Sequence, residues 1–144
     1  MKNYIPFIIL SLLFCCQKQQ DIPELVKKAF ETKFSEAKHL KWTYENGIWE
    51  VSFYKNSQKY SSTFDEQGRW LETEHDINKN NLPLIILENL QTSYEKYEVD
   101  DVAFVESNER EFYEIELEFE GKDIEVLYNK EGHVVKEYIN EIED

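Results

Sequence analysis

The chain contains 144 residues, of which 16 are Lys or Arg and 30 are Asp or Glu, so its formal net charge is −14. An acidic surface repels phosphate backbones and anionic lipid headgroups, which makes nucleic-acid binding the least favoured function. The two cysteines are adjacent at Cys15 and Cys16, so the rest of the chain must fold on an apolar core without a disulfide.

The first 15 residues indicate an export signal. Lys2 precedes an apolar run over residues 4–14, which is shorter than the roughly 20 residues of a membrane span but suits a signal-peptide core. The run ends at Cys15 and Cys16, and polar residues 17–20 follow. This pattern resembles a bacterial lipobox, which implies cleavage before Cys16 and attachment of diacylglycerol to its sulfur. An ordinary secretory signal and a buried pair of thiols are the alternatives.

The sequence after the signal repeats itself. Residues 21–23 (DIP) reappear as 81–83 (NLP), and residues 64–68 (FDEQG) reappear as 128–132 (YNKEG). The offset grows from 60 to 64 residues, which indicates a four-residue insertion in the second copy. Internal duplication is evidence about architecture, and a unit of about 60 residues is marginally stable alone. We therefore expect the two copies to share one sheet.

The expected organisation has four segments. Residues 1–15 are the signal peptide, 16–21 a tether, 22–77 the first repeat and 80–142 the second repeat. Charge is divided unevenly: residues 16–78 carry nine Lys and Arg against eleven Asp and Glu, whereas residues 79–144 carry six against nineteen. The copies therefore differ in net charge, −2 against −13, and nearly all of the acidity belongs to the second.

Each repeat opens with apolar residues at spacings of three and four, which predicts one amphipathic helix. Asp21 and Asn81 are the expected N-caps, each followed by a proline suited to the first turn. The apolar positions are Ile22, Leu25, Val26, Ala29, Phe30, Phe34 and Ala37 in the first repeat, and Leu82, Ile85, Ile86, Leu90, Tyr94 and Tyr97 in the second.

After each helix the apolar period becomes two, and short turns separate four predicted strands. In the first repeat these cover residues 40–44, 48–54, 59–64 and 69–74; in the second they cover 102–106, 112–120, 124–128 and 134–139. Hairpin connections imply antiparallel pairing with helices on one face. The predicted fold is α+β: two tandem repeats of a helix and a four-stranded meander, joined in one eight-stranded sheet.

A lipobox followed by two aromatic-rich copies of this unit, with the turns at residues 65–68 (DEQG) and 129–132 (NKEG), resembles the PepSY-like family of putative beta-lactamase-inhibitor-like proteins. The resemblance covers about residues 22–142. It implies an exported, non-enzymatic module whose partners dock on the exposed sheet face, and the family carries no catalytic motif.

The sequence contains no recognisable catalytic or metal-binding motif. His39, His75 and His133 have no partners at metal-ligand spacing and are expected to be solvated. With only four glycines, no phosphate-binding loop is present, and no serine lies in a nucleophile-elbow setting. We therefore predict no enzymatic activity, no catalytic residues, no metal site and no cofactor.

One strand carries an acidic ladder. Along the predicted strand 112–120, Glu114, Glu116, Glu118 and Glu120 alternate with apolar residues and so face one side, where Asp123 and Glu125 of the next strand could join them. A solvated face that keeps the sheet soluble is one reading. A docking surface for a basic partner, or for loosely held divalent cations, is the other.

The corresponding strand of the first repeat has little charge on its outward side, where Tyr54 lies. Trp70 and Tyr138 are candidates to share this face. Which side of their strands faces outward is ambiguous, because Leu71 and Val135 are equally suited to face the core. Together they would form an aromatic patch suited to protein recognition, whereas burial in the core is the plainer alternative.

Two functions follow as hypotheses. The first is a lipid-anchored module of the bacterial envelope that binds another protein, and it includes the case of a protein or peptidase inhibitor. Its protein partner would be basic, and the module would contact the membrane only through its lipid anchor. The second is a structural or cation-binding envelope lipoprotein without a dedicated partner.

Overall fold

The computed structural model describes residues 21–140 and contains two α-helices, a short 3-10 helix and eight strands. The elements are α1 (Glu24–Lys33), β1 (Lys38–Glu45), β2 (Ile48–Lys55), β3 (Gln58–Asp65), β4 (Trp70–Asp76), η1 (Lys79–Asn81), α2 (Leu84–Ser93), β5 (Glu98–Ser107), β6 (Glu111–Phe119), β7 (Lys122–Asn129) and β8 (Val134–Asn140). The predicted signal peptide, Cys16 and residues 17–20 of the tether lie outside the described residues.

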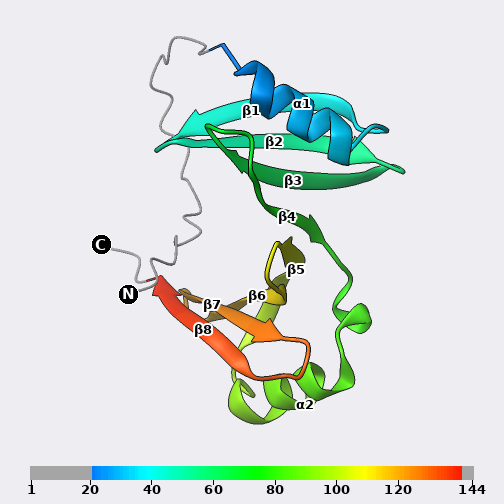
Figure 1. The fold of residues 1–144 in the computed structure, drawn as a ribbon. Helices are drawn as coiled ribbons and strands as arrows, with labels where there is room; N and C mark the ends of the chain where they lie inside the picture. Colours follow the sequence, from blue (N-terminus) through cyan, green and yellow to red (C-terminus); the bar gives the residue numbers. More distant parts are fainter. Residues whose placement is uncertain (1–20, 141–144) are drawn as a thin grey trace.

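All eight strands form one sheet in chain order, β1 to β8, and every neighbouring pair is antiparallel. Figure 1 shows α1 lying along β1 to β3 and α2 lying beside the strands of the second repeat, with β4 running from one half to the other. The predicted α+β fold with one eight-stranded sheet is confirmed.

Strand register shows that both helices cover the same face. Val51, in contact with α1, lies opposite Ser62, which lies opposite Thr73. The row continues from Thr73 on β4 to Glu106 on β5. Four residues earlier on β5, and therefore on the same face, Val102 lies opposite Ile115 in the core beneath α2. We call this side the helix face and the other side the open face.

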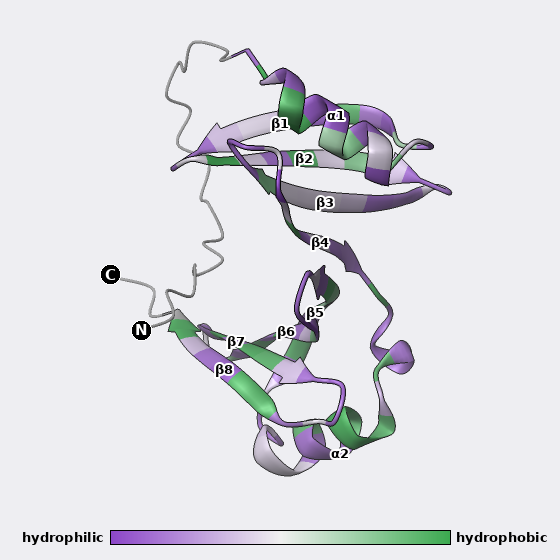
Figure 2. Cartoon of the chain, in the orientation of Figure 1, coloured by the Kyte–Doolittle hydropathy of each residue, from purple (hydrophilic) through white to green (hydrophobic). Residues whose placement is uncertain are grey.

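The helix face holds two separate apolar cores, one for each repeat. The first contains Val26, Phe30, Trp49, Val51, Phe53 and Phe64. The second contains Leu82, Ile86, Leu90, Val102, Ile115, Leu117, Ile124, Val126 and Tyr128. Hydrophobic and hydrophilic residues alternate along the strands in Figure 2, as expected for a sheet whose two faces have different surroundings.

The duplicated FDEQG and YNKEG turns have a common structural role. Gly68 and Gly132 both have positive φ, and both donate a backbone hydrogen bond to the residue three positions earlier. A Cβ on Gly68 would lie 2.7 Å from the carbonyl oxygen of Leu25 in α1, and one on Gly132 would lie 2.8 Å from the side chain of Ile85 in α2. Each turn therefore packs against the start of its own helix, and glycine is required for that close approach.

The predicted helix caps are wrong. Pro23 and Pro83 occupy the N-cap positions, and neither helix has a side-chain cap. Asn81 instead ends η1, which is capped by the side chain of Asn78. Leu25, predicted in the apolar stripe, is mostly exposed, because the buried side of α1 is centred on Val26 and Phe30.

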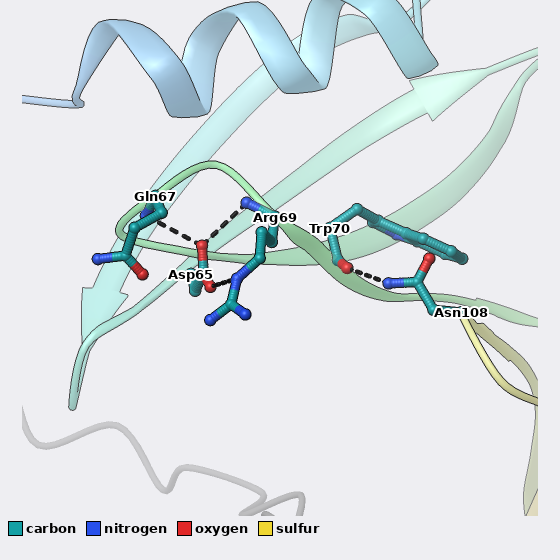
Figure 3. Close-up of polar contacts among 5 residues, drawn as sticks. All are labelled: Asp65, Gln67, Arg69, Trp70 and Asn108. Atoms are coloured by element: carbon teal, nitrogen blue, oxygen red, sulfur yellow. Dashed lines mark hydrogen bonds and ion pairs between the residues drawn. The ribbon is translucent and has the colours of Figure 1, made fainter.

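An aromatic row on the helix face links the two cores. Tyr60, His75 and Phe104 lie on β3, β4 and β5, with ring centroids 4.8 Å apart for the first pair and 5.7 Å for the second. His75 is half-buried there, so the expectation of a solvated histidine is wrong. A separate contact also links the two repeats: Asn108 in the inserted β5–β6 turn donates a 2.7 Å hydrogen bond through Nδ2 to the carbonyl oxygen of Trp70 at the start of β4 (Figure 3).

Candidate functional site

The open face carries the acidic ladder predicted for β6. Ile115 and Leu117 are buried on the helix face, so Glu114, Glu116 and Glu118 lie on the open face. Glu120 does not belong to this ladder. The strand ends at Phe119, and Glu120 occupies a two-residue turn with Gly121 in which both residues have positive φ.

A β-bulge places further carboxylates beside this ladder. The register between β3 and β4 shifts between Thr63 and Phe64, so that Thr63 lies opposite Glu72 while Phe64 lies opposite Trp70. Beyond the bulge Glu72 and Glu74 face the open side of the sheet, and Glu74 lies opposite Val105 of β5. The open face is therefore acidic on both sides of the junction between repeats.

The same bulge moves Trp70 to the helix face, so the expectation that it shares the outer face with Tyr54 is wrong. The Trp70 indole Nε1 donates hydrogen bonds to Ser62 Oγ at 3.1 Å and Thr73 Oγ1 at 2.9 Å. The Lys33 ammonium of α1 lies 3.5 Å from the ring centroid. Trp70 therefore packs beneath α1 and is held by both the sheet and the helix.

Five glutamates make up what we call the acidic patch: Glu72 and Glu74 on β4, Glu114 and Glu116 on β6, and Glu125 on β7. Glu116 lies directly opposite Glu125. Glu114 is on the same strand two residues before Glu116, about 6.5–7 Å away, and is diagonal to Glu125 across the β6–β7 pair. These residues are far apart in sequence but close together in the sheet.

Two members of the acidic patch are buried although they lie on the open face. Glu114 is 7% exposed and Glu125 is 4% exposed. Ala103 lies opposite Glu114 on β5 and Leu127 lies opposite it on β7, so apolar side chains flank the carboxylate. The Oε1 atom of Glu125 is buried and has no hydrogen-bond partner. The reading of this strand as a solvated face therefore fails at these positions.

Burial and like charges shift the protonation of the acidic patch. Burial raises the pKa of Glu114 from 4.5 to about 8, with further increases from Glu125, Glu74, Glu116 and Glu72. Burial and the neighbouring Glu72 raise the pKa of Glu74 to about 7. The pKa values of Glu72, Glu116 and Glu125 are also raised, in each case chiefly by burial. At neutral pH the patch therefore retains protons that exposed glutamates would have lost.

The first repeat contributes a polar, weakly charged half to the open face. Tyr54 is 44% exposed and lies opposite Lys38 and Lys59. Glu50 accepts a 2.7 Å hydrogen bond from Ser61 Oγ. At the other end of the sheet, Tyr138 lies opposite Glu125, and the Lys136 ammonium is 4.0 Å from the Tyr138 ring centroid.

The described residues contain no group of three His, Cys or acidic side chains placed to hold a metal ion. Neither α-helix within residues 21–140 has the length and apolar character needed to cross a bilayer.

Sequence reasoning found part of this site. Glu114, Glu116 and Glu118 were predicted on one face, and Glu125 was named as a possible neighbour. Glu72 and Glu74 were not among the residues named from the sequence. The bulge puts Trp70 on the opposite face from Glu72, two residues later, and the only sequence signal of it was the competition between Trp70 and Leu71 for the core. Burial of Glu114 and Glu125 has no signature in the alternating pattern itself.

The sequence matches the family model described as "Putative beta-lactamase-inhibitor-like, PepSY-like" over residues 17–62 and 49–136. No curated protein matches the sequence significantly.

Several solved structures share the fold. A BLIP-like protein from Bacteroides fragilis has a TM-score of 0.76 at 22% identity, with 87% of this chain and 91% of that chain covered. A DUF2874 family protein from Bacteroides ovatus has a TM-score of 0.76 at 19% identity, covering 83% and 89%. A protein from Bacteroides eggerthii described as a putative periplasmic protein has a TM-score of 0.76 at 15% identity, covering 83% and 90%.

Proposed function

Because the chain belongs to the putative beta-lactamase-inhibitor-like, PepSY-like family, we propose that it is an exported, non-enzymatic module that binds another protein through the open face of its sheet. The observation that carries the proposal is the contrast between the faces. Both helices cover the helix face, while the open face combines buried carboxylates with Tyr54, Tyr138 and apolar side chains. Such a mixture of aromatic, apolar and charged groups suits protein recognition.

The proposed location is the bacterial envelope. The lipobox-like sequence supports attachment of lipid to Cys16, and a structural relative described as periplasmic supports export. A tether over residues 16–21 spans at most about 15–20 Å when extended. The module then lies close to the membrane, with the nearly neutral first repeat nearer to it than the acidic second repeat.

The proposed partner includes the case of an enzyme that the module inhibits, which is the case that the family description favours. The open face extends over both repeats, so a partner can contact the weakly charged half around Tyr54 and the acidic patch together. The proposed partner surface is therefore basic opposite the second repeat and polar or aromatic opposite the first.

Site-specific photocrosslinking in intact cells tests the proposal. p-Benzoylphenylalanine replaces Tyr54 or Tyr138 on the open face, and replaces Leu84, a 70% exposed residue of α2, as the control. We expect one discrete crosslinked protein from the two open-face positions and none from the Leu84 position. Equal products from all three positions, or none from Tyr54 and Tyr138, would contradict the proposal.

The second candidate function is a cation-binding or structural envelope lipoprotein without a dedicated partner. The unpartnered carboxylate oxygen of Glu125 is the observation that favours it. A rise in melting temperature with millimolar calcium, lost in Glu125→Gln and kept in Glu118→Gln, would support this function. An unchanged melting temperature would dispose of it.

A further inference from the structure

We propose that the acidic patch receives an arginine side chain of the partner protein, with its guanidinium placed between Glu114 and Glu125 and its stem against the apolar groups around them. The proposal rests on the proposed function, since it specifies the chemistry by which the open face recognises a partner.

The unpaired carboxylate oxygen of Glu125 supports an arginine ligand. Buried polar atoms almost always have a hydrogen-bond partner, and leaving one unpaired costs roughly 1–3 kcal/mol, more for a charged group. Glu125 Oε1 lacks such a partner, although the residue is 4% exposed and its carboxylate interacts electrostatically with Glu116 and with the Lys136 ammonium. A donor supplied from outside the chain would satisfy it.

The spacing of the Glu114 and Glu125 carboxylates also suits a guanidinium. Glu114 and Glu125 are diagonal across two strands, so their Cβ atoms are separated by somewhat less than about 7–8 Å. This spacing is wide for direct coordination of one small ion by both groups. A planar guanidinium has five N–H donors arranged as a fork and can bond to two carboxylates at once.

Apolar and aromatic side chains border the two carboxylates. Ala103, Val105 and Leu127 border Glu114, and Tyr138 lies opposite Glu125. An arginine stem packs on such surfaces, and its guanidinium is more weakly hydrated than an ammonium and stacks on aromatic rings. Lys136 already lies over the Tyr138 ring at 4.0 Å, which shows that a cation is accommodated at this end of the patch.

The charges that face Glu114 come from several strands and are nearly all negative. They are Glu50 on β2; Glu72, Glu74 and Asp76 on β4; Asp101 on β5; Glu116 and Glu118 on β6; Asp123 and Glu125 on β7; and Lys136 on β8. Because the pKa of Glu114 is raised to about 8, its carboxyl is largely protonated at neutral pH in the free protein. Entry of the guanidinium favours the carboxylate, so the carboxyl proton is released to solvent on binding.

Isothermal titration calorimetry tests the proposal. The ligand is a tetra-arginine peptide with acetylated and amidated ends, and it is titrated into the mature protein purified from the cells that export it. Binding is measured at constant ionic strength and pH 7, in two buffers that differ in ionisation enthalpy, so that proton release is counted. A tetra-lysine peptide of equal charge is the comparison ligand. The variants are Glu114→Gln with Glu125→Gln, and Glu118→Gln as the matched control on the same strand and face.

We expect tetra-arginine to bind about threefold or more tightly than tetra-lysine, with net proton release. We expect the double variant to weaken tetra-arginine binding at least about tenfold, and Glu118→Gln to change it less than about twofold. Equal weakening by the double variant and the control, or no binding by the wild-type protein, would overturn the proposal. Thermal melting of each variant checks that the fold is kept.

Crosslinking from Tyr138 in cells separates this inference from the proposed function. If the crosslinked partner is lost in the Glu114→Gln and Glu125→Gln variant and retained in Glu118→Gln, both stand. If the partner is retained in all variants, the open face is the docking surface but the arginine site is wrong. If the wild-type protein gives no partner, the proposed function fails, and the peptide titration then decides the chemistry of the patch alone.

Discussion

Glu116 on β6 lies directly opposite Glu125 on β7, so the open face pairs two like charges at a position where one of them is buried. Like charges opposite each other in a sheet are destabilising, and burial adds to that cost. The pKa values of both glutamates are accordingly raised. The free protein therefore keeps an unfavourable arrangement that a cationic partner would relieve.

The substitution Glu114→Gln should stabilise the protein at high pH. Its carboxyl must ionise in buried surroundings as the pH approaches 8, whereas an amide stays neutral. At pH 8.5 we expect the free energy of unfolding in urea to rise by roughly 1–3 kcal/mol. At pH 5, where Glu114 is protonated, we expect little change. A similar gain in the exposed Glu118→Gln variant would show that general charge reduction, and not burial, is responsible.

The wild-type protein should lose stability as the pH rises. Folding raises the pKa of Glu114 to about 8 and that of Glu74 to about 7, from 4.5. The folded state then binds protons more tightly, so this stabilisation is complete below pH 4.5 and is lost as the pH rises to about 8.

Burial lowers the pKa of His75 below 6.5, and His75 opposes the trend at the acidic end because its protonation disfavours the folded state. We expect the two glutamates to outweigh it. Urea titrations at intervals from pH 5 to 8.5 should give a falling free energy of unfolding, with a smaller slope in Glu74→Gln with Glu114→Gln. A rising free energy in the wild-type protein would refute this expectation.

The turn at residues 65–68 should tolerate no side chain at Gly68. Gly47 and Gly68 both have positive φ, but a Cβ on Gly47 meets nothing within 4 Å, whereas one on Gly68 lies 2.7 Å from a backbone oxygen of α1. We expect Gly47→Ala to reduce the free energy of unfolding by about 1 kcal/mol and Gly68→Ala by roughly 3 kcal/mol. Equal losses measured by urea denaturation would mean that the turn does not pack against α1.

The inserted turn at residues 107–110 should contribute to the junction between the repeats. Asn108 donates to the Trp70 carbonyl oxygen, which lies at the first residue of β4 (Figure 3). Asn108→Ala should lower the free energy of unfolding by about 0.5–1.5 kcal/mol. Neighbouring Glu109→Ala is the control, and hydrogen exchange at the start of β4 should be faster only in the Asn108 variant.

The sequence predicted those features that depend on local pattern. Alternation and turn chemistry placed all eight strands, and the duplication anticipated the shared sheet. Features that depend on packing were not predictable: the bulge between β3 and β4 places Trp70 on the helix face, whereas Glu72, two residues later, lies on the open face. Asp21 and Asn81 had the right residue types for caps, but each proline occupies the N-cap position itself. Glu120 left the ladder because the β6–β7 turn begins one residue earlier than its alternation suggested.

Measuring the pKa of Glu114 is the sharpest test of whether the acidic patch is buried and binds a guanidinium. Carboxyl carbon NMR of the selectively labelled protein follows its protonation between pH 3 and 10, with and without the tetra-arginine peptide. We expect a pKa of about 8 in the free protein and a clearly lower pKa in the presence of the peptide. A free-protein value near 4.5, unchanged by the peptide, would contradict both the buried patch and its proposed ligand.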